Sequence, residues 1–134
     1  KSYGEEVGLD WEDYFVAYAL GRSYVGMRAE DILVCARLAA EKAGLPQTGL
    51  WAVGNVGVPG LHAAALEPGI FASVKLTRTL NAWANVVHMR PTKNQLINTV
   101  HGALTFYDLP DLAGTLAEKL TIEQPLDAQG NPVQ

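Results

Sequence analysis

The stretch whose residue types best suit a reactive site is 50–66, with the sequence LWAVGNVGVPGLHAAAL. An apolar run precedes Gly54, Gly57 and Gly60, and small residues follow them. This order predicts a buried strand, a tight turn and a helix that packs closely on the sheet. In many α/β enzymes such a turn carries the nucleophile, but this one contains no Ser, Cys or Asp. The stretch therefore predicts a fold more strongly than a reaction.

The other nucleophiles of the chain lack the context of a reactive site. Ser23 lies in a Gly-Arg-Ser turn, where a helix cap is expected. Ser73 falls inside an apolar run that predicts a strand. Cys35, the single cysteine, lies in a predicted helix among apolar residues and is expected to be a buried small hydrophobic residue. None of the three is therefore a catalytic candidate.

Two residues are candidates for binding a ligand. His101 precedes an apolar segment and could line a cleft, and Asn55 lies in the glycine turn. No two histidines have the i, i+4 spacing of a metal site, so no metal is expected. The glycine spacing G-x-x-G-x-x-G matches neither the dinucleotide fingerprint nor a phosphate loop, so no cofactor is expected. A small-ligand binder that uses the glycine turn remains the third and weakest alternative.

Several polar and aromatic residues fit structural roles better than functional ones. Asp108 and Asp111 flank Leu109-Pro110 and predict a turn that caps a helix. Four aromatic side chains could form a sugar-binding platform, but core packing is the preferred interpretation for them: Trp11, Phe15, Trp51 and Trp83.

Composition narrows the class of protein and of partner. The chain has 134 residues, of which 49% are hydrophobic and 18% charged, which predicts one globular domain over 1–134. The formal net charge of −4, without a basic cluster, argues against a nucleic-acid partner. No apolar run approaches the roughly 20 residues of a membrane helix. One cysteine excludes an internal disulfide and says little about compartment.

The periodicity predicts alternating helices and strands. Helices are expected near 11–20, 25–43, 61–66, 93–100 and 111–118, and strands near 50–53, 70–74 and 120–122, while 77–92 is ambiguous. This alternation predicts an α/β fold whose short parallel sheet is flanked by helices and covered on both faces. Three strands make a small sheet with exposed edges, so we expect a larger domain. Another polypeptide segment or a second copy is expected to cover the sheet edge.

Four segments in this order resemble the C-terminal half of an α/β-hydrolase domain. They are LGRSYVGMR from Leu20 with Asp31, the strand–turn–helix with AAAL at 63–66, YDLPDL at 107–112, and LTI at 120–122 running into PLDA at 125–128. The resemblance is to the acetylxylan esterase, dienelactone hydrolase and prolyl oligopeptidase type. It spans most of residues 14–133 and points to large bacterial proteins with esterase-like domains, some of which lack the serine.

The resemblance assigns roles to three positions of the catalytic triad. In the family, the turn is Gly-x-Ser-x-Gly, whose serine is exposed by a sharp bend. Aligning Gly60 and Ala63 on the packing positions puts Gly57 at the nucleophile, or Val56 after a register shift. Asp127 matches the family's acid, and the histidine is expected beyond Gln134. The nucleophile is replaced, the acid is retained as a possible remnant, and the histidine falls outside this chain.

The resemblance therefore implies a catalytically degenerate hydrolase-like domain that serves a larger esterase- or peptidase-like protein as a structural or binding part. The alternative is an active carboxylic-ester hydrolase on acetylated carbohydrate, completed by residues from outside the chain. The preference rests on the missing serine, because its loss costs about a millionfold in rate in a serine hydrolase. The resemblance also favours an exported protein, although the sequence does not assign the compartment.

Overall fold

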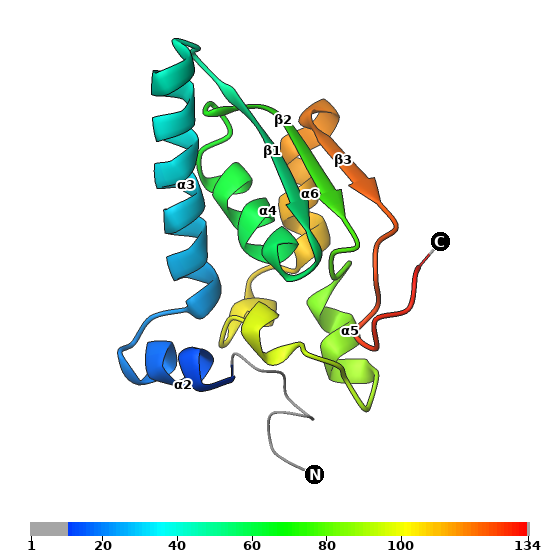
Figure 1. Cartoon of the computed structure of the whole chain (residues 1–134). Coiled ribbons are helices and arrows are strands. Elements are labelled where there is room, and N and C mark those ends of the chain that lie inside the picture. The colour runs from blue at the N-terminus through cyan, green and yellow to red at the C-terminus, as the bar shows by residue number, and fades with distance from the viewer. Residues whose placement is uncertain (1–10, 134) are drawn as a thin grey trace.

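The structure is a computed structural model that describes residues 11–133. Its elements alternate as the sequence predicts, and Figure 1 shows their arrangement. The helices are α2 (Trp11–Ala19), α3 (Tyr24–Ala43), α4 (Gly57–Leu66), α5 (Trp83–His88) and α6 (Leu109–Leu116), with 3-10 turns η1 (Gly54–Val56), η2 (Leu96–Asn98), η3 (Ala103–Thr105) and η4 (Ala117–Lys119). The strands are β1 (Thr48–Val53), β2 (Phe71–Thr77) and β3 (Leu120–Glu123).

The three strands form one parallel sheet in the order β1-β2-β3. Parallel strands need crossover connections, and α4 supplies the one between β1 and β2. The second connection is longer and ends with α6 and the turn η4, which leads into β3. The predicted small α/β fold with a short parallel sheet is confirmed.

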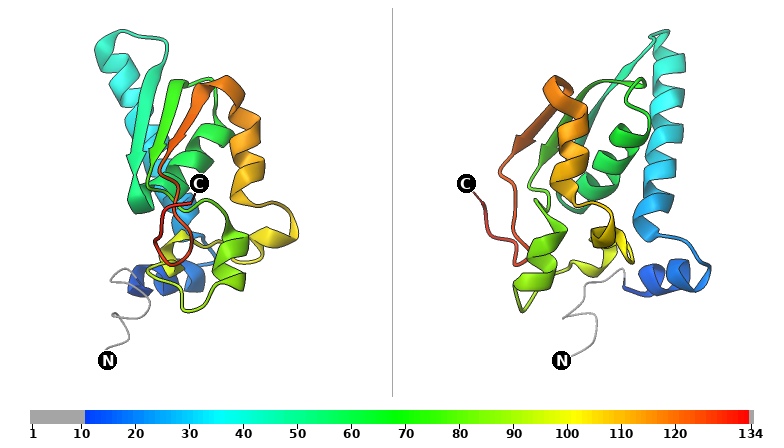
Figure 2. Two further views of the ribbon diagram at one scale, coloured as in Figure 1. Left: turned by 90° about the vertical axis from the view of Figure 1, so that its right-hand side faces the viewer. Right: turned by 180° about the vertical axis from the view of Figure 1, so that it is seen from behind.

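The prediction that helices cover both faces of the sheet is wrong for residues 11–133. Figure 2 shows α4 and α6 on the same side of the strands, and Figure 1 shows the other face bare. Exposure along β1 agrees, because Ala52 is buried beneath the helices while Trp51 and Val53 are exposed on the opposite face. Alternation of elements predicts crossovers, but it does not determine on which face each helix packs.

Side chains of neighbouring strands contact one another across the bare face. The Lys75 ammonium lies 5.0 Å from the centre of the Trp51 ring and 2.9 Å from a carboxylate oxygen of Glu123. The Trp51 indole N–H donates to the Thr77 hydroxyl at 3.0 Å. Trp51 nevertheless remains 68% exposed, so core packing is the wrong interpretation for this tryptophan, whereas Trp83 is buried.

The main core lies between the sheet and the helices α3, α4 and α6. Phe71, Val74 and Leu76 of β2 are almost fully buried, and they pack with Val58 of α4 and Leu109 of α6. Each buried large side chain contributes about 1.5–3 kcal/mol relative to an exposed one. The central strand β2 therefore holds both helices against the sheet.

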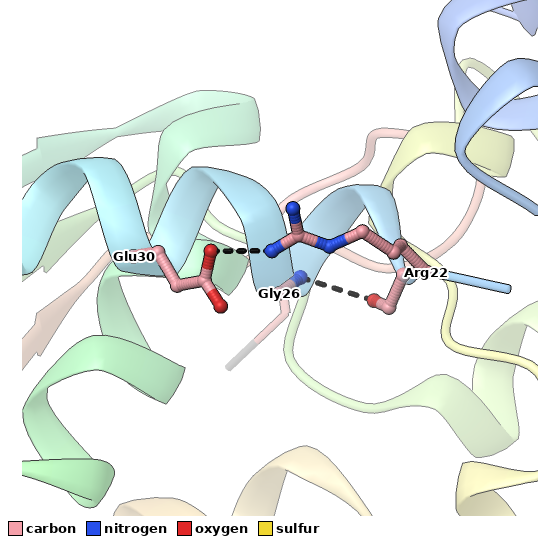
Figure 3. Close-up of polar contacts among 4 residues, drawn as sticks. Arg22, Gly26 and Glu30 are labelled. Atoms are coloured by element: carbon pink, nitrogen blue, oxygen red, sulfur yellow. Dashed lines mark hydrogen bonds and ion pairs between the residues drawn. The ribbon is translucent and has the colours of Figure 1, made fainter. Parts of the chain in front are cut away.

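The helix α3 has the end signals that its sequence predicts. The Ser23 hydroxyl accepts a hydrogen bond from the Gly26 N–H at 3.0 Å. The guanidinium of Arg22, which precedes the helix, pairs with the Glu30 carboxylate within it, as Figure 3 shows. Gly44 ends the helix with a φ of +66°, a conformation that glycine adopts without strain. The predicted cap at Ser23 is confirmed.

Three local predictions need correction. Cys35 is exposed, because it lies at an open groove between α3 and β1. The predicted helix at 93–100 is reduced to the turn η2, since Asn94 has a φ of +53° and Thr99 is extended. The helix after the glycine turn begins at Gly57, four residues before the predicted start. Within residues 11–133, no helix has the length and apolarity that crossing a membrane requires.

Candidate functional site

The chain bends sharply between β1 and α4, as the strand–turn–helix pattern predicts. Val53 is still extended, with φ −122° and ψ 132°, and Gly54 follows with a φ of +64°. η1 then leads into α4 at Gly57. The positive φ favours glycine at position 54, because a Cβ atom there would strain the backbone. The bend therefore presents no reactive side chain.

Gly57 lies after this bend and inside the first turn of α4. Its backbone is helical, with φ −64° and ψ −40°, and the residue is buried. A Cβ atom at this position would lie 1.9 Å from the Thr79 Oγ1 and 2.6 Å from the Thr79 Cβ. Position 57, at which the alignment puts the nucleophile, therefore has no room for a side chain. It also lies three residues after Gly54, the glycine with positive φ.

Asn55 joins the turn to a group of buried amides. The Asn98 Nδ2 donates to the Asn55 Oδ1 at 3.2 Å and to the Gln95 Oε1 at 3.1 Å. The Asn98 carbonyl in turn accepts the indole N–H of Trp83 at 2.6 Å. Asn98 is only 2% exposed, and its Oδ1 accepts no hydrogen bond from residues 11–133. A buried acceptor of this kind favours a donor from water or from a bound molecule.

His101 lines a pocket of about 300 Å³ between α2 and the segment that precedes η3. Its ring meets Tyr18 edge to face, with the centroids 5.5 Å apart. Tyr14, Arg22 and Ser23 line the same pocket. The prediction that His101 lines a cleft is confirmed. This cleft lies beside α2, and neither Asn55 nor Asp127 lines it.

Asp127 is occupied in building a turn. Its Oδ1 accepts the backbone N–H groups of Gln129 at 2.8 Å and Asn131 at 2.9 Å, and its Oδ2 accepts the Asn131 side-chain amide at 3.3 Å. These hydrogen bonds, led by that from the Asn131 backbone, lower the pKa of Asp127. Among residues 11–133, no hydrogen bond, ion pair or ring contact joins Asp127, His101 and Asn55. The candidates named from the sequence do not form one site.

A second group near the turn centres on His62 of α4. The His62 Nδ1 lies 2.8 Å from the Val58 carbonyl, and the Nε2 lies 3.0 Å from the Tyr107 hydroxyl. Because a carbonyl only accepts, Nδ1 carries the proton and Nε2 accepts from Tyr107. The rings of Trp83 and Tyr107 each lie within 6 Å of the imidazole centre, at 5.4 and 5.9 Å.

Burial lowers the pKa of His62 from its ordinary value of 6.5, and the hydrogen bond to Val58 only partly opposes this effect. The unfolded chain therefore binds more protons than the folded chain just below pH 6.5. We expect the free energy of unfolding to be constant above this pH and to fall as the pH decreases from 6.5 towards the lower pKa of the folded state.

Urea denaturation at pH values between 5 and 8, roughly the range in which histidines titrate, measures this dependence. His62→Gln should flatten the profile, and His88→Gln, at an exposed position, is the matched variant. A profile that keeps its slope in His62→Gln would show that another group causes the dependence.

The remaining chemistry of the described residues gives no further site. Within residues 11–133, no three His, Cys, Asp or Glu side chains cluster in the way that holds a metal ion. Comparisons of the chain with protein-family models, with curated proteins and with solved structures find no match.

Proposed function

We propose that this chain is a catalytically inactive α/β domain of hydrolase type. It serves a larger esterase- or peptidase-like protein as a structural or binding part. The observation that supports this proposal is the turn from β1 into α4, which bends at Gly54 and carries no nucleophilic side chain from Gly54 to Gly57. In addition, Gly57 is buried against Thr79, so a serine side chain would not fit at this position.

The imidazole of His62 in α4 is also unsuited to general-base catalysis at this turn. His62 uses both ring nitrogens, one towards Val58 and the other towards Tyr107. The Tyr107 hydroxyl is a weak acid whose pKa burial raises further, so it is not an activated nucleophile. This pair is better described as a packed, hydrogen-bonded support between α4 and the start of α6.

Hydrolysis of a short acyl ester tests the proposal directly. We expect p-nitrophenyl acetate to be hydrolysed no faster with the protein than in buffer, and a serine-directed fluorophosphonate to leave the protein unlabelled. The physical reason is that loss of the serine alone removes about a millionfold of rate in a serine hydrolase.

Labelling of a serine together with turnover would contradict the inactive assignment. It would favour the alternative, an active carboxylic-ester hydrolase for acetylated carbohydrate that is completed from outside the chain. Because the chain contains only Ser2, Ser23 and Ser73, serine-to-alanine variants at these positions would identify the labelled residue. An adventitious esterase in the preparation would instead leave the activity unchanged in all three variants.

The second part of the proposal concerns partners. Within residues 11–133, β1 and β3 each have one edge that no strand covers. We propose that another polypeptide segment or a second copy covers an edge of this sheet, because unpaired edges with exposed apolar side chains favour association.

A further inference from the structure

The helices form a layer that extends past the sheet at the β1 side. α3 packs on α4, α4 packs on α6, and α3 lies beyond the outer edge of β1 in both Figure 1 and the reverse view of Figure 2. α4 directly precedes β2, and α6 precedes β3 through η4. α3 precedes β1 in the same way. In a parallel sheet, a helix that precedes a strand and packs on the same face connects it to another parallel strand. Within residues 11–133 no strand precedes α3, so the helix layer leaves room for one more strand beside β1.

A groove of about 330 Å³ marks this position. Its helix side is formed mainly by Ile32, Cys35 and Ala39 of α3, and its strand side includes Gly49 and Leu50 of β1. Apart from Asp31 at the helix side, the lining contains no charged residue. The groove therefore suits apolar side chains that point to the helix face of the sheet.

The backbone of β1 is prepared for pairing at this edge. The Thr48 N–H donates to the Ile70 carbonyl at 2.9 Å, so the backbone groups of Thr48 point towards β2. The register shifts between Thr48 and Gly49, and the later residues are placed by β2: the Arg78 N–H donates to the Glu123 carbonyl at 3.0 Å, so the backbone groups of Thr77, and by alternation of Lys75 and Ser73, point to β1. The residues paired with these three, which are Val53, Trp51 and Gly49, therefore point to the uncovered edge. β1 has no Lys or Pro, the residues with which natural proteins block a strand edge.

We propose that the outer edge of β1 binds a β-strand of another polypeptide segment that runs parallel to β1. The incoming strand is uncharged and places apolar side chains in the groove beneath α3. This inference rests on the proposed function, in which the chain is one part of a larger protein, and it names the edge, the direction and the chemistry of the partner. The helix layer argues for a parallel strand, whereas a second copy paired by a two-fold axis would place its β1 antiparallel.

The single cysteine, Cys35, provides a direct test because it is exposed and lines the groove. The probe is a short synthetic peptide of alternating Val and Thr between terminal Lys residues, and the control is the same peptide with a central Pro. We expect the alternating peptide to slow the reaction of Cys35 with Ellman's reagent roughly tenfold at ten times its Kd, and the Pro peptide to have no effect. A nitroxide at the peptide N-terminus should broaden the amide signal of Gly49 more than that of Val53.

Two exposed positions on α3 give a matched pair of variants. Ala39→Glu puts a carboxylate in the groove, and Val34→Glu puts one outside it. Protection of Cys35 should be lost in Ala39→Glu and kept in Val34→Glu. Absence of protection at the solubility limit of the peptide, or protection that survives Ala39→Glu, would overturn the proposal.

Protection by higher protein concentration alone, with a dimer in sedimentation, would overturn it in favour of a second copy. Stronger broadening at Val53 than at Gly49 would overturn the parallel direction. None of these readouts depends on ester hydrolysis, so failure here and failure of the inactive-hydrolase proposal are distinguishable.

Discussion

Gly57→Ala is expected to lower the free energy of unfolding by about 3 kcal/mol, the upper range for overpacking a core position. The added Cβ would lie 1.9, 2.4 and 2.6 Å from the Oγ1, Cγ2 and Cβ of Thr79. A new Thr79 rotamer moves the first two atoms but not the third, and Thr79 is only 3% exposed. The start of α4 must therefore move away from the end of β2. Urea denaturation followed by circular dichroism measures the loss.

Gly114→Ala provides the matched control, because a Cβ atom at this exposed position in α6 meets no atom within 4 Å. Alanine there should stabilise the protein by about 0.5–1 kcal/mol through its higher helix propensity. In a Thr79→Gly background, the cost of Gly57→Ala should fall below about 1 kcal/mol, since interacting residues are not additive. An equal cost in both backgrounds would show that Thr79 is not the cause.

Asp108→Ala is expected to lower the free energy of unfolding by about 2–3 kcal/mol, more than a usual helix cap. One carboxylate accepts the N–H groups of Trp83 at 2.6 Å, Ala84 at 3.1 Å and Leu109 at 2.6 Å. It thus satisfies N–H groups in the first turns of both α5 and α6, two helices with twenty residues between them in the chain. Its negative charge also complements both N-terminal dipoles.

Two variants separate this double role from an ordinary cap. Asp111→Ala removes only the acceptor for the Asp108 N–H at 2.8 Å, and it should cost about 1 kcal/mol. Asp108→Asn keeps one acceptor oxygen and should fall between the two alanine variants. If Asp108→Ala costs no more than Asp111→Ala, the contacts to α5 contribute nothing to stability.

The prediction that Asp108 and Asp111 cap a helix is confirmed, because its signals are local, although α6 begins at Leu109, two residues before the predicted start. Asp108 and Asp111 form a capping box, with Pro110 in the first turn of α6. The same holds for Ser23 and Gly44 at the ends of α3. The second partner of Asp108, the helix α5, was not predictable, because 77–92 has no comparable end signal and the contact joins distant segments.

The candidate site shows the same division. The residue types in the turn sufficed to exclude a nucleophile between Gly54 and Gly57. They did not reveal which glycine holds the bend, because φ at Gly54 and the space at Gly57 depend on β2 and Thr79. Asn98 was missed for a similar reason, since its segment carried a helical pattern and its role depends on Asn55 and Trp83.

By itself the sequence determined the alternation of helices and strands, the ends of α3 and the absence of a reactive side chain in the turn, because these follow from residue types at short spacing. Only the tertiary structure decided which face of the sheet is covered, why Trp51 and Cys35 are exposed and where the strand edge remains open. These features depend on how α3, α4 and α6 pack against one sheet face. Packing of this kind joins residues far apart in the chain, and a local pattern does not contain it.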